Sequence, residues 1–134
     1  TQADSIVQVL AELARRGVEI RLLHAGVPSS AALRELRDRL DGCGRLTIRR
    51  CPRLHAKAVI VDCQAMYLGS ANLTGAGLGA KGAGKRNFEM GVWTRSPDLI
   101  DAGMQSLNAL WGGERCRDCR RKDVCPVPLE EPRL

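Results

Sequence analysis

Two short stretches of the chain hold polar side chains at spacings that suggest chemistry. They read His55-Ala-Lys57-Ala-Val-Ile-Val-Asp62 and Tyr67-Leu-Gly69-Ser70-Ala-Asn72. In a strand alternate residues share a face, so the His and the Lys of the first stretch point to the same side. The second stretch follows at hairpin distance, which returns its Ser and its Asn to the side of His55 and Lys57. An imidazole, a cation and two neutral polar groups on one rim suit a phosphate.

These stretches resemble the signature of the phospholipase D superfamily, His-x-Lys-x4-Asp followed by Gly-Ser-x-Asn. Six positions match in residue type and spacing: His55, Lys57, Asp62, Gly69, Ser70 and Asn72. The resemblance covers roughly residues 5–111 and includes Glu89, where the family carries a Glu that orients the catalytic His. It therefore implies a catalytic set made of His55, Lys57, Asn72, Ser70, Glu89 and Asp62.

The resemblance also implies a covalent mechanism that needs no cofactor for catalysis. One His attacks phosphorus to give a phosphohistidine, while a second His protonates the leaving oxygen and then activates water. Lys57 and Asn72 supply the charge stabilisation, so no metal step is required. Glu89 is expected to accept Nδ1–H of His55, which leaves Nε2 as the nucleophile. Asp62, at the far end of its strand, is interpreted as structural.

The mechanism needs two histidines, whereas the chain carries one signature. His24 is the other His of the sequence, and it lacks a following Lys-x4-Asp. It is interpreted as structural. The second catalytic His is therefore expected from another copy of the chain, in a symmetric homodimer with both His55 side chains at one site, as in single-signature members of the family.

Charge and composition favour a polyanionic substrate. The net charge is +6, which suits the phosphate backbone of nucleic acid. Aromatic residues make up only 3%, so stacking on bases is not expected to drive binding. In a Gly-rich loop at 75–84 and just after it, Lys81, Lys85 and Arg86 are expected to bind substrate; a solvated loop tip is the alternative. Glycine patterns in this loop resemble nucleotide-binding motifs, but they do not lie between a strand and a helix as those motifs require.

These features predict a phosphodiesterase, foremost an endonuclease. Two other functions stay open: a non-catalytic nucleic-acid-binding module that serves a helicase or a defence complex, and a phospholipid-cleaving enzyme. No apolar run approaches the ~20 residues that span a bilayer, and no signal-peptide pattern is present. A cytoplasmic protein without a membrane partner is therefore expected.

The C-terminal stretch carries a second pattern, Cys116-x2-Cys119-x5-Cys125, which is metal-ligand spacing. It resembles the cysteine triplet of the Cas4 and AddB type of nucleases, in which an upstream Cys completes a [4Fe–4S] cluster. Zinc, an iron–sulfur cluster, reduced thiols and disulfides all remain open. Cys43, Cys51 and Cys63 compete as the fourth ligand. Cys51 is favoured because it lies four residues before His55, on the sheet edge where the tail is expected to arrive.

Hydrophobic periodicity places these motifs on alternating helices and strands. Helices are expected from Asp4 or Ser5 to Gly17, from Ser29 or Ser30 to about residue 40, and over 97–110. Strands are expected over 18–23, 46–50 and 88–94, besides the hairpin. This alternation predicts an α/β fold with a mixed, largely parallel sheet flanked by helices, a phospholipase D-like half-domain. Residues 1–112 form the expected catalytic domain, which lacks a first strand of the family, and residues 113–134 the Cys-rich metal-binding tail.

Overall fold

The structure is a computed structural model that describes residues 6–25, 35, 38–40, 44–71, 88–121 and 125. The chain divides into two compact units. The first unit combines residues 1–54 with residues 110–134, and the second unit is residues 55–109. The Cys-rich tail therefore groups with the N-terminal part of the chain.

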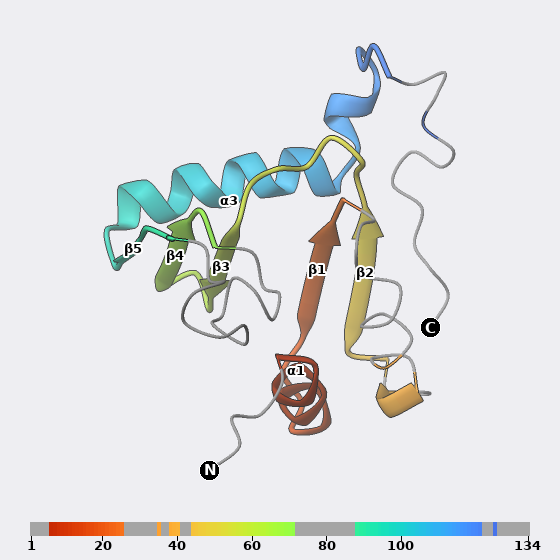
Figure 1. The fold of residues 1–134 in the computed structure, drawn as a ribbon, viewed down its shortest axis with the longest axis vertical. Helices are drawn as coiled ribbons and strands as arrows, with labels where there is room; N and C mark the ends of the chain where they lie inside the picture. The colour runs from red at the N-terminus through yellow and green to blue at the C-terminus, as the bar shows by residue number, and fades with distance from the viewer. Residues whose placement is uncertain are drawn as a thin grey trace. The chain divides into compact units, whose positions relative to one another are not determined.

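The first unit is built on a pair of parallel strands covered by a helix (Figure 1). Its elements are α1 (Ile6–Arg15), β1 (Ile20–His24) and β2 (Leu46–Arg50). Every residue of β1 pairs with one of β2, from Ile20 opposite Leu46 to His24 opposite Arg50. The core joins the apolar stripe of α1 to the inner face of the strands and consists of Val7, Ala11, Ala14, Leu40, Leu46 and Ile48.

Gly17 ends α1 and turns the chain toward β1. Its φ of 95° lies in the left-handed region, which glycine adopts without steric cost. The amide of Val18 then donates to the carbonyl of Leu13 at 3.0 Å. That cap uses Val18, so β1 begins two residues later than the pattern predicts.

The second unit is a three-stranded antiparallel sheet with a long helix (Figure 1). Its elements are β3 (Ala58–Val61), β4 (Ala65–Gly69), β5 (Gly91–Thr94) and α3 (Pro97–Trp111), of which the last two residues belong to the first unit. The strand order is β3-β4-β5. The side chain of buried Met66 reaches α3 at Gly103, where the helix lacks a side chain. The sheet thus packs on α3 at this glycine.

The expected mixed α/β class is confirmed, but the share of parallel strand pairs is smaller than expected. Among the described strands, one pair is parallel and two pairs are antiparallel, so the sheet is less parallel than expected. The hairpin makes β3 and β4 antiparallel, and β5 also pairs with β4 in an antiparallel manner. The second expected helix is described only at Glu35 and over residues 38–40, which are helical.

Candidate active site

His55 and Lys57 lie at the open end of the β3–β4 hairpin, immediately before β3. The Lys57 Nζ lies 3.1 Å from Nε2 of His55 and donates to the His55 carbonyl oxygen at 2.8 Å. An ammonium has hydrogen-bond donors and no lone pair. The contact therefore fits a His55 whose Nε2 carries the lone pair. His55 is exposed, so this nitrogen is accessible to a substrate.

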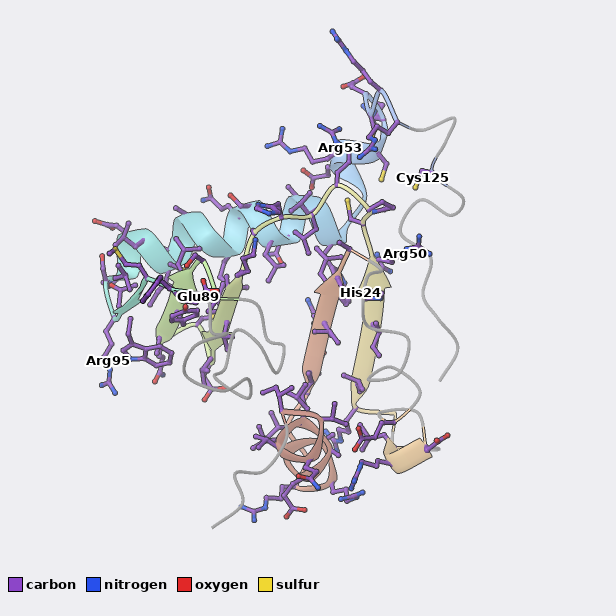
Figure 2. All side chains as sticks on the ribbon, in the orientation of Figure 1. His24, Arg50, Arg53, Glu89, Arg95 and Cys125 are labelled. Atoms are coloured by element: carbon purple, nitrogen blue, oxygen red, sulfur yellow. The ribbon has the colours of Figure 1, made fainter. Side chains whose placement is uncertain are left out.

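Ser70 and Glu89 meet at the same end of the sheet. The Ser70 hydroxyl donates to Glu89 Oε2 at 2.6 Å and accepts the amide of Met90 at 3.0 Å. The Ser70 amide donates in turn to the Met90 carbonyl, also at 3.0 Å. Ser70 thus holds the segment before β5 against the end of β4. Glu89 is labelled beside these strands in Figure 2.

One backbone hydrogen bond connects the His55–Lys57 pair to the Ser70–Glu89 pair. The amide of Gly69 donates to the carbonyl of Lys57 at 3.1 Å, which continues the β3–β4 ladder past its last pair. Lys57 and Ser70 are thereby fixed at adjoining positions of one sheet end. The hairpin predicted from the sequence accordingly brings His55, Lys57 and Ser70 to one edge, and the bond from Ser70 brings Glu89 there.

Gly69 and Gly91 allow β4 and β5 to approach at this edge. The two residues are cross-strand partners, and the Tyr67 ring lies over both. A Cβ on Gly91 would come within 2.5 Å of the Tyr67 ring, and one on Gly69 within 2.8 Å of the Gly91 backbone. The glycine of the Gly-Ser-x-Asn stretch is therefore required by close packing.

Asp62 does not join this group. It lies in the turn between β3 and β4, at the opposite end of the hairpin from His55. Its φ is 51° and that of Cys63 is 53°, and Gln64 N donates to the Val61 carbonyl at 2.9 Å. Two successive positive φ values give the tight turn that hairpins prefer, and Asp tolerates this conformation. The geometry agrees with the structural role expected for Asp62.

Several predicted site residues lie outside the described residues: Asn72, Lys81, Lys85 and Arg86. The bond expected from His55 to Glu89 is not among the hydrogen bonds of the described residues, in which Glu89 Oε2 accepts from Ser70. His24 ends β1 in the first unit, opposite Arg50. Burial, and then the charge of Arg50, lower the pKa of His24 below its ordinary value. The structural role of His24 stays a prediction.

The described tail contacts the segment that leads to His55. Arg53 Nη1 donates to Cys119 Sγ at 3.3 Å, and this bond raises the pKa of Arg53 and lowers the pKa of the Cys119 thiol. Sequence reasoning did not single out Arg53. The available signal was its position between Cys51 and His55, two residues that could take part in metal binding or catalysis.

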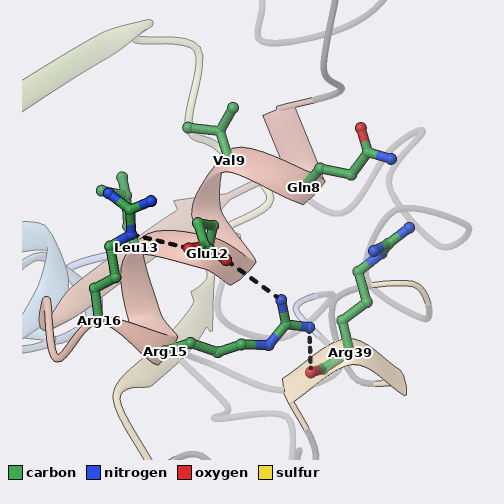
Figure 3. A pocket seen from close by; sticks show the side chains of 7 residues that line it. All are labelled: Gln8, Val9, Glu12, Leu13, Arg15, Arg16 and Arg39. Carbon is green, nitrogen blue, oxygen red and sulfur yellow. Dashed lines mark hydrogen bonds and ion pairs between the residues drawn. The ribbon is translucent and has the colours of Figure 1, made fainter.

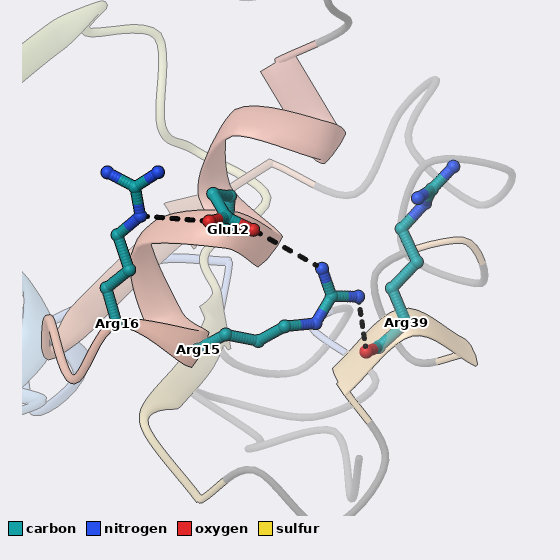
Figure 4. Close-up of polar contacts among 4 residues, drawn as sticks. All are labelled: Glu12, Arg15, Arg16 and Arg39. Atoms are coloured by element: carbon teal, nitrogen blue, oxygen red, sulfur yellow. Dashed lines mark hydrogen bonds and ion pairs between the residues drawn. The ribbon is translucent and has the colours of Figure 1, made fainter.

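A surface hollow on the first unit offers no second candidate (Figure 3). It lies over the outer face of α1, and its charges are paired. Glu12 forms ion pairs with Arg15 and Arg16, while Arg15 also donates to the Arg39 carbonyl at 3.2 Å (Figure 4). Arg39 itself pairs with Glu35. These contacts tie α1 to the helical segment at residues 38–40.

Comparison with known proteins agrees with the fold and the signature. Residues 2–111 match the family described as "Cardiolipin synthase, PLD-like domain". The chain belongs to the phospholipase D superfamily. Nuc from Salmonella typhimurium, a phospholipase D family member of known structure, is similar with a TM-score of 0.64 and 18% identity, over 96% of this chain and 74% of Nuc. No curated protein matches the chain.

Membership of the superfamily makes this chain a phosphodiesterase-type protein. Enzymes of the superfamily are typically independent of metal ions, and members that consist of one half-domain often dimerise. Within the described part of the chain, no helix combines the length and the apolar character that crossing a membrane requires.

Proposed function

We propose that this phospholipase D-like chain is a metal-independent endonuclease whose site is shared by two copies. One observation carries the proposal: His55 presents Nε2 beside the Lys57 ammonium, on the same sheet end as the Ser70–Glu89 pair. A nucleophile with a lone pair next to a fixed cation suits in-line attack on a phosphodiester.

In the first step, His55 Nε2 attacks phosphorus and a P–N bond forms as the P–O bond to the leaving group breaks. Lys57 already donates to the His55 carbonyl and lies beside Nε2. An ammonium has three N–H bonds and no lone pair. When substrate binds, the N–H that faces Nε2 turns to a phosphate oxygen, which frees the Nε2 lone pair for the attack. Charge that builds up on that oxygen is stabilised at a fixed position, which lowers the barrier.

The leaving oxygen takes its proton from a second imidazolium, which we assign to the partner copy's His55. In the second step this imidazole removes a proton from water as the water attacks the phosphohistidine. The P–N bond breaks and the first His55 is regenerated. Among the described residues, the only other His is His24, which pairs within the first unit, so a second copy is the natural source of the acid.

Nucleic acid is the substrate that the charge favours. The chain carries 21 basic and 15 acidic residues, and the tail around Cys116 contains Arg115, Arg117, Arg120 and Arg121. Contacts between such side chains and phosphates give affinity without sequence preference. The proposed enzyme is therefore sensitive to salt in binding and tolerant of sequence.

A phospholipid substrate is the second candidate, because apolar side chains are exposed beside Glu89. Phe88, Met90 and Trp93 are 107%, 83% and 58% exposed. Such a group can contact lipid or a second copy of the chain. Vesicles of phosphatidylglycerol and a plasmid, offered to the same preparation, separate the two substrates.

The deciding experiment measures cleavage of plasmid and of single-stranded DNA and RNA by wild type, His55→Ala and Lys57→Ala, with and without EDTA. We expect wild-type cleavage to persist in EDTA. Both substitutions should lower the rate at least ~10²-fold, because each removes a group from the transition state. Cys63→Ser, in the hairpin turn, is the matched control and should keep full activity.

Three results would contradict the proposal. Activity that disappears with EDTA while His55→Ala remains active would show metal-dependent chemistry elsewhere. Salt-sensitive DNA binding without any cleavage would identify a binding module. Release of a lipid headgroup without nuclease activity would establish the phospholipid alternative.

A further inference from the structure

In the described tail, the half-buried residues and the exposed residues differ in kind. From Glu114 to Arg121, every residue is charged except the two cysteines. Cys116 and Cys119 are half-buried, while all their charged neighbours are exposed. No apolar side chain in this stretch is available to anchor it, so hydrophobic burial does not account for its placement. Its inward face consists of thiols.

Successive turns of the backbone set the positions of these thiols. After α3 the chain turns at Gly113, whose φ is 78°, into the short 3₁₀ helix η2 (Glu114–Cys116). The Cys119 amide then donates to the Cys116 carbonyl at 3.2 Å, and the Cys125 amide donates to the Arg121 carbonyl at 2.8 Å. Short Cys-x-x-Cys turns of this kind place two thiols on one side of the backbone.

A fourth thiol is held at the carboxyl end of the parallel strands of the same unit. Cys51 follows β2, and its amide donates to the His24 carbonyl at 2.8 Å, which extends the ladder by one bond. A turn closed by Leu54 N and the Cys51 carbonyl at 2.9 Å follows. Arg53, within that turn, donates to Cys119.

Arg53 shows that Cys51 and Cys119 belong to one neighbourhood. Arg53 lies two residues after Cys51 in the chain, and its Nη1 donates to Cys119 Sγ at 3.3 Å. Figure 2 shows the labelled Arg53 and Cys125 in the region beyond the strand ends at His24 and Arg50, all in the first unit. The end of β2 and the tail thus lie in one region of the first unit, connected by the bond from Arg53 to Cys119.

We propose that Cys51, Cys116, Cys119 and Cys125 form a four-thiolate site for a thiophilic metal, either a zinc ion or an iron–sulfur cluster. Among the described residues, no three His, Cys, Asp or Glu side chains converge closely enough to hold an ion. Metal binding therefore has to draw the thiols together and displace Arg53 from Cys119. A metal would then supply the anchor that the hydrophilic tail lacks.

The test measures zinc and iron per chain in the full-length protein purified without oxygen. We expect stoichiometric metal in wild type and an at least ~10-fold loss in Cys51→Ser and Cys119→Ser, since a three-ligand site binds far more weakly. Cys63→Ser is the matched control, because Cys63 is exposed in the hairpin turn of the second unit. It should keep its metal. Arg53→Gln should also keep it, because Arg53 gives way when the metal binds.

Cobalt(II) provides a readout that does not depend on the variants folding. Added to metal-free wild type, it should give the intense thiolate-to-cobalt absorption of tetrahedral sulfur coordination. Wild type without metal and without this absorption would overturn the proposal. So would full occupancy in Cys51→Ser together with loss in Cys43→Ser or Cys63→Ser, or a Cys51–Cys119 disulfide found by mass spectrometry in place of metal.

Discussion

At the scale of single residues, Ser70 is a positioning residue in the proposed site. Its hydroxyl has one proton, and the 2.6 Å bond to Glu89 Oε2 uses it. The oxygen also accepts the Met90 amide. A hydroxyl engaged on both sides is a poor nucleophile, whereas it fixes the carboxylate well. The role of Ser70 is therefore expected to be exerted through Glu89.

This coupling gives a prediction for substitutions at Ser70. Ser70→Ala should lower kcat by about 10-fold, because a hydrogen bond to a charged group contributes ~1.5–3 kcal/mol when partly shielded and less when exposed. Ser70→Thr keeps the hydroxyl and should retain most of the activity. Steady-state kinetics on a nucleic-acid substrate measure both effects.

Glu89→Gln provides the control for this prediction. If Ser70 acts through Glu89, the double variant Ser70→Ala/Glu89→Gln should lose no more activity than Glu89→Gln alone. Losses that multiply would show that Ser70 acts independently, for example by direct contact with the substrate.

At the scale of elements, the sequence predicts those helices and strands that are determined by residues close together in the chain. The span of β2 matches residues 46–50, and the hairpin matches because a run of β-branched residues is followed by a tight turn at Asp62. β5 is shorter than predicted, since it begins at Gly91 and not at residue 88. Glu89 and Met90 bond to Ser70 just before the strand begins, and a contact between distant residues leaves no mark in local periodicity.

Contacts between distant residues also account for what could not be predicted in the site. The signature places His55, Lys57 and Ser70 on one sheet end because the hairpin alone does so. The partner of Glu89 depends on how β5 meets β4, and this is decided by packing. Arg49 illustrates the same limit: it lies 5.1 Å from the ring centroid of Trp111 at the end of α3, which no local pattern indicates.

The contact between Gly69 and Gly91 gives a prediction for stability. Gly69→Ala would press a methyl group against the β5 backbone and should destabilise the fold by about 1–3 kcal/mol. Gly91→Ala meets mainly the Tyr67 ring, which is a side chain and is able to move. Urea unfolding followed by circular dichroism measures both changes.

Tyr67→Ala distinguishes the two glycines. In that background Gly91→Ala should become nearly neutral, because its steric partner is gone, while Gly69→Ala should still destabilise through the backbone of β5. If Tyr67→Ala reduced the destabilisation by both glycine substitutions equally, the two strands would not approach as closely as the structure places them.

At the scale of the whole molecule, the apolar residues around Glu89 are the surface that we expect the proposed second copy to cover. We call Phe88, Met90 and Trp93 the β5 patch. In the described sheet β5 is an edge strand, and an exposed apolar edge tends to pair with another chain. The patch includes both neighbours of Glu89 in the sequence. A partner that covers it therefore lies next to the proposed catalytic groups.

Substitution of the β5 patch should dissociate the proposed dimer and lower the rate of cleavage to the same extent. Phe88→Ser removes an aromatic side chain that is 107% exposed in the isolated chain. Its burial by a partner contributes roughly 1.5–3 kcal/mol, so the dimer dissociation constant should rise by about 10- to 100-fold. The molar mass from light scattering and the activity, measured across one concentration series, should fall in parallel.

Val18→Ser, at a residue 42% exposed in the first unit, is the matched control and should change neither. A Phe88→Ser chain that is monomeric yet fully active would mean that one copy completes the site alone. One that stays dimeric would place the interface elsewhere.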